Sequence, residues 1–293
     1  MTISAKIIAH SIAPNGQLIV TWELEYQRFI HGEFMTHRLF SRNAASSRAI
    51  PVKSILAAVR QHEALPIYWG KNQSGMQAKE ELQGLTKSAV QSLWVAAANA
   101  AANFAEEMDF HGLHKQTANR ILEPFQTMKT VMTATCMDNF FWLRNHEDAQ
   151  PEIKELARLM CEALEASVGV QLEPGDWHVP YFGNGQWFAK RDEMPLADAL
   201  AISSSCCAQV SYRKLDDTLE KAQMVYQRLV GSEPVHASPF EHQATPMRNK
   251  PDFRNKGVTH KDRDGNFWSG NFVGWIQHRQ LIPNNVCMKY EVK

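Results

Sequence analysis

The sequence has no excess charge of either sign, since 31 lysines and arginines face 31 aspartates and glutamates among 293 residues. A protein that holds nucleic acid or a membrane surface through its overall field needs a clear net charge, so neither partner is expected. No apolar run approaches the ~18 residues of a membrane span, and residues 1–10 lack the basic-then-apolar pattern of a signal peptide.

Cysteine motifs and the common nucleotide-binding motifs are also absent. The five cysteines have no regular spacing and form no CxxC pair, so we expect no disulfide framework and a reducing, cytoplasmic location. Cys206 and Cys207 lie among small residues and are predicted to be core. There is no GxGxxG, P-loop, HExxH or HxH, which disfavours a Rossmann fold, a P-loop enzyme, a metal-dependent hydrolase and any metal site.

What the chain does contain is enough apolar sequence, 44%, to bury the core of one large domain or two small ones. Leu18–Tyr26 alternates apolar and polar residues, which predicts a half-buried strand. The Ala-rich stretch Ser74–Phe110 predicts one long helix that ends at His111-Gly112. Several helices with scattered strands predict an α+β fold.

Two further helices and one loop are predicted downstream. One helix should carry Pro151 in its first turn and end near Gly169, with an apolar stripe that includes Ile153, Leu156 and Met160. Leu215–Val230 predicts another amphipathic helix, capped by Asp216 or Asp217. The charged, Gly/Asn-rich residues 249–269 predict a surface loop.

The segment from Glu33 to Arg48 concentrates groups that can bind ligands. If it begins as a helix, Glu33, Thr36, His37 and Phe40 share one face. Ser46, Ser47 and Arg48 could grip a phosphate, because hydroxyl and backbone N–H groups donate and the guanidinium adds a planar charge. A solvated basic turn is the alternative that residue chemistry leaves open.

Residues 36–48, THRLFSRNAASSR, resemble the signature RHRxxSxNExSxR of the flavin-dependent thymidylate synthase (ThyX) family, and residues 21–38 resemble its lead-in. Three positions depart: Thr36 replaces an arginine, Ala44 replaces a glutamate, and Glu33 stands where the family has a glutamine. The signature positions that are kept are His37, Arg38, Ser41, Asn43, Ser46 and Arg48.

Two later blocks resemble the same family. ANRILEP, residues 118–124, is similar to its ARxxLP, which makes Arg120 a substrate-phosphate residue by resemblance. NFFWLRNHEDAQPEI, residues 139–153, is similar to HFLxLRxxxHAQxEI. This second likeness places Arg144 at the pyrimidine ring and Asn139 against the flavin.

Two blocks of the family occur here in a rotated order. CAQVSY, residues 207–212, and HASPFEH, residues 236–242, look like CAxxSY…HxSPFEH, which precede the arginine signature in ordinary members. Circular permutation is the simplest interpretation, and it is tolerable where exchanged termini lie at the surface. We therefore expect a single catalytic domain over residues 1–293, with signature and helices in residues 1–170 and a permuted segment in residues 171–293 that carries His242.

The resemblance implies a mixed sheet with a long-helix bundle, and a homotetramer whose active sites are shared between subunits. It implies FAD, with NADPH and methylenetetrahydrofolate as co-substrates, and C5 methylation of dUMP. Arg144 would be catalytic and would also bind substrate. The other implied substrate contacts are Glu33, Ser46, Ser47, Arg48 and Arg120; the implied flavin contacts are His37, Arg38, Asn43, Asn139 and His242.

Several alternatives stay open. A carboxylate at Glu33 accepts but cannot donate hydrogen bonds, which keeps dCMP as a substrate and hydroxymethylation as an outcome. Thr36 and Ala44 favour a non-catalytic nucleotide-binding module instead. Gln277, His278 and Arg279 could form an active-site wall or a surface strand, and residues 177–182 are expected to be packing.

Overall fold

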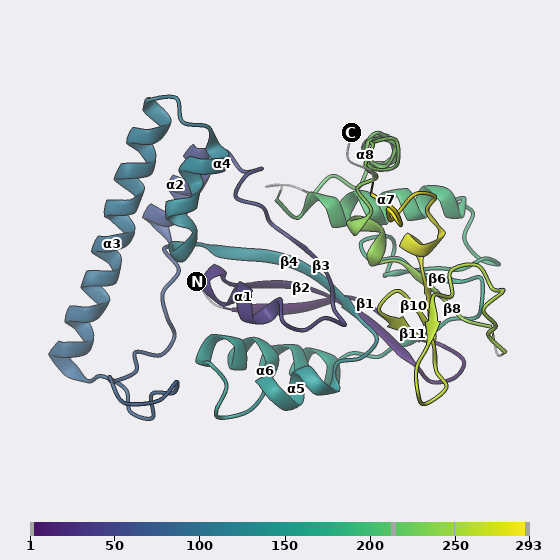
Figure 1. The fold of residues 1–293 in the computed structure, drawn as a ribbon, viewed down its shortest axis with the longest axis horizontal. Helices are drawn as coiled ribbons and strands as arrows, with labels where there is room; N and C mark the ends of the chain where they lie inside the picture. The colour runs from purple at the N-terminus through teal and green to yellow at the C-terminus, as the bar shows by residue number, and fades with distance from the viewer. Residues whose placement is uncertain (1–2, 212–214, 249, 291–293) are drawn as a thin grey trace.

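A computed structural model of the chain describes residues 3–211, 215–248 and 250–290, and Figure 1 shows its fold. The main sheet has five strands, and all pairs are antiparallel except β1 with β5, which is parallel. The α+β class and the mixed sheet are therefore confirmed, as is the strand predicted from Leu18. In spatial order the strands are β3 (Ser41–Ala44), β4 (Thr127–Ala134), β2 (Leu18–Gln27), β1 (Ser4–Ile12) and β5 (Val170–Gln171).

One face of this sheet is apolar and is covered by α5 (Asp138–Arg144) and α6 (Pro151–Glu165) (Figure 1). Trp22 and Leu24 alternate along β2 and are fully buried in this core. The start of α6 at Pro151 confirms the prediction, but the helix ends at Glu165 rather than near Gly169.

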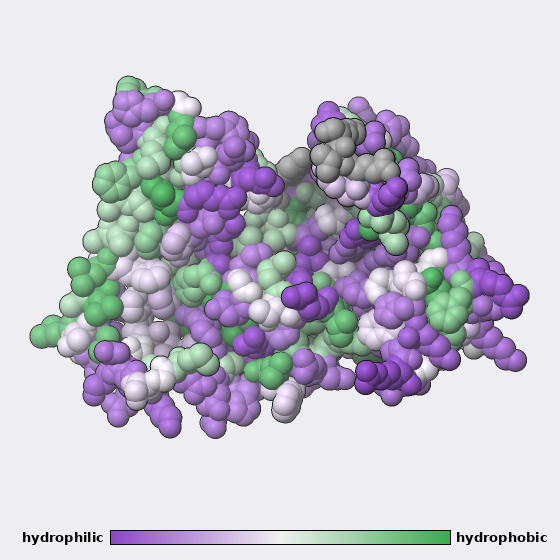
Figure 2. Space-filling view, in the orientation of Figure 1, coloured by the Kyte–Doolittle hydropathy of each residue, from purple (hydrophilic) through white to green (hydrophobic). Residues whose placement is uncertain are grey.

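The opposite face of the sheet is polar, because Thr21, Glu23 and Glu25 alternate with the buried apolar residues of β2. Helices stand on both sides of this face, and Figure 2 shows the surface hollowed between them. On one side are α2 (Val52–Gln61), α3 (Gly84–Phe110), α4 (Lys115–Ala118) and the 3-10 helix η2 (Asn119–Phe125). On the other side are α7 (Leu196–Ala208), η3 (Gln209–Ser211) and α8 (Leu219–Val230).

The C-terminal part of the chain adds two small sheets. The core formed by Ile19 from β2, with Phe272 and Trp275 from this part, packs them onto the main sheet. The first has four strands in the order β12 (Trp275–Gln277), β8 (Ala244–Pro246), β6 (Trp177–His178) and β7 (Gln186–Trp187). The second has three strands in the order β11 (Phe272–Val273), β10 (Phe267–Ser269) and β9 (His260–Lys261). The region predicted as a loop, residues 249–269, thus contains two strands of a hairpin, although Asn249 lies outside the described residues.

Three helix predictions need correction. The long helix begins at Gly84 rather than Ser74. Gly75 has a positive φ angle of 98°, which an α-helix interior does not adopt, and Gly84, with φ 56°, marks the start of the helix. Helix α8 begins at Leu219, and its cap is Thr218, whose side chain accepts from Lys221 N. Asp216 is not the cap, since its carboxylate accepts from the N–H and hydroxyl of Thr218 instead.

The helical face considered for Glu33, Thr36, His37 and Phe40 does not form. The short helix α1 (His31–Phe34) ends early, because both the hydroxyl and the N–H of Thr36 donate to Glu33 O and close a tight turn. The core placement of Cys206 and Cys207 in α7 is confirmed. Among the described residues, no helix is long and apolar enough to cross a membrane.

Candidate active site

The signature segment runs along β3, at the edge of the main sheet. Ser41 pairs with Thr133 and Asn43 with Val131, so these side chains face the polar side of the sheet. Arg42 and Ala44 face the α5–α6 side, where Ala44 packs against the apolar core. A glutamate at position 44 would place its carboxylate in that core, so the alanine suits this position.

The residues predicted to hold phosphate meet at one carboxylate. Ser47 Oγ donates to Glu123 Oε1 over 2.7 Å, and Arg120 Nη1 donates to the same oxygen over 2.8 Å. Arg28 Nη2 is a third donor, at 2.9 Å. Sequence reasoning missed Arg28 and Glu123, although Glu123 lies within the ANRILEP block that singled out Arg120.

The ionisation of Glu123 follows from these contacts. Burial raises the pKa of the carboxyl, but the Ser47 hydroxyl and the guanidinium groups of Arg28 and Arg120 outweigh it, so the pKa lies below its ordinary value. Glu123 is therefore a carboxylate at neutral pH.

The turn that carries Ser46, Ser47 and Arg48, which are predicted to bind phosphate, is held in place by hydrogen bonds from the helices beside it. Asn119 Nδ2 donates to Ser47 O over 2.7 Å and to Ile50 O over 3.0 Å, while Lys115 Nζ donates to Ala49 O over 3.0 Å. Ser46 is half-buried and Arg48 is exposed. The turn is thus fixed in shape and leaves the Arg48 guanidinium at the surface.

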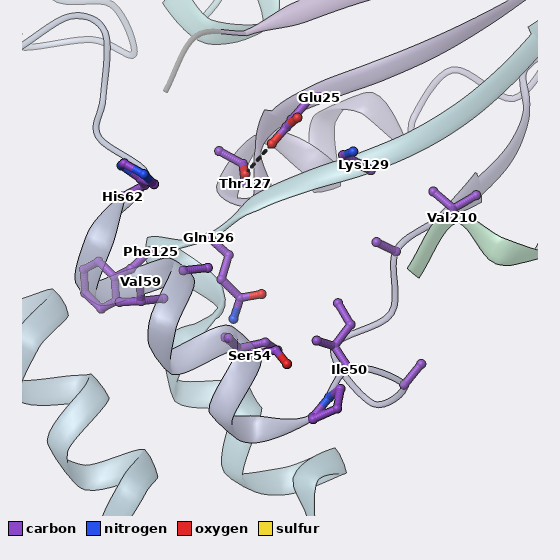
Figure 3. Close-up of a pocket in the computed structure, with 15 residues that line it drawn as sticks. Glu25, Ile50, Ser54, Val59, His62, Phe125, Gln126, Thr127, Lys129 and Val210 are labelled. Atoms are coloured by element: carbon purple, nitrogen blue, oxygen red, sulfur yellow. Dashed lines mark hydrogen bonds between the residues drawn. The ribbon is translucent and has the colours of Figure 1, made fainter. Parts of the chain in front are cut away.

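A cavity of about 700 Å³ opens beside this turn (Figure 3). Its apolar side comes from α2 and from Phe125, its polar side comes from β2 and β4, and Val210 of η3 lies opposite. A volume of this size suits a nucleotide-sized ligand. The residues that line it are Glu25, Ala45, Ala49, Ile50, Pro51, Ser54, Ile55, Ala58, Val59, His62, Phe125, Gln126, Thr127, Lys129 and Val210.

A second group forms where α5 meets the loop before β3. Arg144 Nε donates to His37 Nε2 over 3.0 Å, and the His37 ring packs edge-on against Phe140 with centroids 4.8 Å apart. Burial, together with the charges of Arg144 and Arg42, lowers the pKa of His37 to about 4. Neutral His37 therefore accepts a hydrogen bond from Arg144, and this bond fixes the orientation of the guanidinium.

The remaining predicted residues of the first 150 lie near this group. Asn139 is exposed on α5, in the same helix as Arg144. Glu33 of α1 and Arg38 of the following loop are also exposed. Their charged and amide groups are accessible to a ligand on this side of the molecule.

The two blocks found in rotated order pack against the signature strand. Asn43 Nδ2 donates to Cys207 O over 3.2 Å, and His242, which follows the 3-10 helix η4 (Ser238–Glu241), bonds through Nδ1 to Thr133 Oγ1 over 2.8 Å. These contacts bring both blocks against β3 and β4, and the permutation itself stays a prediction. Tyr212 lies outside the described residues.

Gln277 also joins this part of the site. Its side chain is buried, and Nε2 donates to Ser41 Oγ over 3.3 Å and to Asn271 Oδ1 over 2.9 Å. A surface strand is therefore the wrong alternative for Gln277. Arg279 follows in the 3-10 helix η5 (His278–Leu281), and its guanidinium pairs with Glu241.

A continuous buried chain of hydrogen bonds runs from β1 to His242. Ser11 Oγ meets His178 Nδ1 at 2.9 Å, and His178 Nε2 meets Thr21 Oγ1 at 2.8 Å. Thr21 Oγ1 meets Thr133 Oγ1 at 2.7 Å, and Thr133 in turn meets His242. All five residues are fully buried. His178 was expected only to pack in the core, because nothing in its local pattern signals partners more than 150 residues away.

This chain predicts acid sensitivity. Burial lowers the pKa of His178 and of His242 to about 3, whereas both would titrate near 6.5 in the unfolded chain. Between these values the unfolded state binds more protons than the folded state, so the free energy of unfolding falls as the pH falls below about 6.5. The expected slope is about 1.4 kcal/mol per pH unit for each histidine below pH ~6.

Urea unfolding at pH 7.0, 6.0 and 5.0 measures this slope. Replacing His178 with glutamine should reduce the pH dependence of the free energy of unfolding by the contribution of one histidine. The control His111→Gln, at an exposed position, should leave that pH dependence unchanged. A wild-type stability that is flat over this range would contradict the neutral, buried state of the two rings.

The predicted site residues of one chain fall into separate groups. Among the residues that the structure describes, no hydrogen bond or ion pair joins the Arg144–His37 group to the Ser47–Arg120 group. The former lies at α5, and the latter lies beside η2.

Residues 12–168 match the family described as thymidylate synthase complementing protein, which is more than half of the chain. No curated protein matches the sequence. Among solved structures, the fold is similar to a UMP/dUMP methylase, PolB from Streptomyces cacaoi, bound with 5-Br UMP, with a TM-score of 0.46, 16% identity, and coverage of 56% of this chain and 88% of that one. The same methylase bound with 5-Br dUMP has a TM-score of 0.45, 16% identity, and coverage of 56% and 90%.

Proposed function

The chain belongs to the thymidylate synthase complementing protein family and is a thymidylate synthase-like methyltransferase, and we propose that it methylates C5 of a deoxypyrimidine monophosphate with FAD. The first candidate reaction converts dUMP to dTMP, with methylenetetrahydrofolate as carbon donor and NADPH as reductant. The observation that carries the proposal is the convergence of Ser47 and Arg120, 73 positions apart, on one anionic group. Ser47 belongs to the turn whose Ala45 and Ala49 line the nucleotide-sized cavity, and this turn is its rim.

The nucleotide phosphate would bind at this rim. Arg48 is exposed and Arg120 is half-exposed, so both guanidinium groups can reach an incoming phosphate. Ser46 and Ser47 lie in the same fixed turn and add hydroxyl donors. The turn is already ordered by Asn119, so little conformational freedom is lost on binding.

The residues predicted for FAD fit such a group. Exposed Arg38 suits a pyrophosphate, and His242 Nε2 is a buried polar atom without a partner among the described residues. Bound FAD would supply the reducing equivalents for the methyl transfer. His37, Arg38 and Asn139 would hold it near α5, while Asn43 and the buried His242 would contribute from the polar side of the sheet.

Arg144 would act on the pyrimidine ring. C5 becomes nucleophilic when negative charge spreads onto the ring oxygens, and a fixed guanidinium stabilises that charge. The bond to neutral His37 uses Nε of Arg144, which leaves the two terminal nitrogens for the ring. His37 would thereby position the catalytic group as well as contact the cofactor.

A homotetramer with shared sites fits the separation of the two residue groups. We propose that Arg120 of one subunit works with Arg144 of another. Arg120→Ala and Arg144→Ala should each be nearly inactive alone, because the first leaves the Glu123 carboxylate less neutralised next to the substrate phosphate and the second removes the guanidinium at the pyrimidine ring. Mixed and allowed to exchange subunits, the two variants should regain about a quarter of wild-type activity, since some sites then hold both arginines. No recovery after verified exchange would contradict a shared site.

The base is the second open choice. Glu33 is an exposed carboxylate on α1, which favours the cytosine 4-amino donor over uracil O4 if it faces the base. Parallel assays with dUMP and dCMP, given methylenetetrahydrofolate, NADPH and FAD, with products identified by mass, decide between them. The proposal expects a methylated product from dUMP; a methylated or hydroxymethylated product from dCMP alone would move the assignment to the cytosine alternative. A chain that binds nucleotides but takes up no FAD would instead be the non-catalytic module.

A further inference from the structure

Glu123 stands at the centre of the group that should receive the substrate phosphate. One of its oxygens, Oε1, accepts from Ser47, Arg28 and Arg120 within 2.9 Å. In the resembled motif ARxxLP, the position before the proline is a leucine, and here it is Glu123 followed by Pro124. This chain therefore has an anion of its own where the resembled pattern has an apolar side chain.

The surroundings keep that anion in place. The side chains of Arg28 and Glu123 are 15% and 24% exposed, and Ser47 is buried. Arg28 Nη1 also donates to Ala45 O over 3.3 Å, which ties the pair to the strand that leads into the phosphate-binding turn. Because the pKa of Glu123 lies below its ordinary value, protonation does not release the donors near neutral pH.

A carboxylate and a phosphate compete for the same donors. The oxygens of a carboxylate lie in a plane and those of a phosphate form a tetrahedron, but both groups accept charge-assisted hydrogen bonds from guanidinium and hydroxyl groups. A phosphate that binds Arg120 and Ser47 must displace Glu123 Oε1, or else lie next to a second negative charge in a partly desolvated place. Arg48 is exposed, and no hydrogen bond or ion pair given for the described residues joins it to Glu123.

We propose that Glu123 determines specificity at the 5′ end of the substrate by competing with the nucleotide phosphate for Ser47, Arg28 and Arg120. The inference rests on the proposed function, because it assumes that a pyrimidine nucleotide binds at this rim. The chain then gains little affinity from a 5′-phosphate. It accepts deoxypyrimidine nucleosides with an uncharged 5′ group nearly as well as the monophosphates.

Calorimetric titration with dUMP and with deoxyuridine tests this role. Glu123→Gln keeps the shape of the side chain and removes its charge, and Glu106→Gln is the matched control, since Glu106 is an exposed carboxylate paired with Arg60. Wild type should bind the two ligands within about threefold of each other, whereas Glu123→Gln should bind dUMP at least about tenfold more tightly and deoxyuridine unchanged. Glu106→Gln should match wild type.

A purely structural Glu123 predicts a different pattern, in which Glu123→Gln weakens both ligands together or changes neither. Either pattern overturns the inference. Glu123→Leu, which restores the resembled motif, serves as the second variant if the glutamine variant fails to fold. If dUMP binds wild type tightly and Arg120→Ala weakens it, but neither Glu123 variant tightens it, this inference fails and the proposed function stands. If no variant binds dUMP or dCMP, both fail.

Discussion

Replacing Arg144 with alanine is expected to lower kcat/KM for dUMP methylation by about 100- to 1,000-fold, the usual loss when one fixed stabiliser of developing charge is removed. Arg144 is half-buried on α5, and its orientation is set by the bond from Nε to His37. Alanine leaves the helix intact and removes the guanidinium. The loss should therefore appear in kcat as well as in KM, because the charge matters most in the transition state.

Arg158→Ala is the matched control for Arg144→Ala. Arg158 lies on the neighbouring helix α6 and is partly exposed. Among the described residues, its ion pairs are with Glu155 and Glu162 of its own helix. Surface pairs of this kind contribute little to stability, so this variant should keep nearly full activity. The pKa of His37 should also rise in Arg144→Ala, because one of the charges that lower it is gone. More than about a tenth of wild-type activity in Arg144→Ala would remove Arg144 from the catalytic role.

Thr133→Val is expected to lower the free energy of unfolding by about 2–3 kcal/mol, with no change in side-chain shape. The hydroxyl of Thr133 bridges Thr21 and His242 in the buried chain, and valine breaks both bonds. Both ring nitrogens of His242 then lie buried without a partner among the described residues, since Nε2 already has none. Leaving such polar atoms unpaired carries most of the loss.

Chemical denaturation of Thr133→Val against Thr86→Val measures this loss. Thr86 is exposed in the first turn of α3, so its valine variant should stay within about 0.5 kcal/mol of wild type. Equal stability of the two variants would mean that the hydroxyl of Thr133 does not support His242. A selective loss of FAD affinity in Thr133→Val, beyond that of Thr86→Val, is expected if His242 reaches the cofactor site.

The parts of the fold that were predictable from the sequence are those with strong local signals. The two-residue alternation of Leu18–Tyr26 reflects a strand with one apolar face, and Pro151 suits the first turn of α6. Local composition failed where a single backbone angle or hydroxyl decides the outcome. Ser74–Gln83 is polar and Ala-containing like a helix, but Gly75 turns the chain, and Thr218 outcompetes Asp216 as the cap of α8.

Some residues of the candidate site were likewise predictable from the sequence, and others were not. The family resemblance placed Ser47 and Arg120 on one phosphate, and the structure brings both to Glu123. Arg28 could not be predicted, because a lone arginine after a strand has no sequence pattern that marks it as a site residue. The bond between His178 and Thr21 joins residues 157 positions apart, so only the packing of one sheet on another could reveal it.

Two departures from the signature have local physical reasons. Thr36 replaces an arginine and closes the turn after α1 through Glu33 O. Ala44 faces the apolar core beneath β3. Neither change removes a donor from the Ser47–Arg120 group or from the Arg144–His37 group, so both are compatible with catalysis. Glu33 is the departure that bears on the base, since its side chain is exposed on α1.

A single-turnover experiment tests the central claim most directly. The chain is loaded with FAD, reduced without oxygen, and mixed with dUMP and methylenetetrahydrofolate while flavin absorbance and product mass are followed. Flavin-dependent C5 methylation predicts that the flavin is reoxidised and dTMP appears in equal amount, and that omitting either substrate stops both. A flavin that stays reduced while dUMP is recovered unchanged would contradict the assignment.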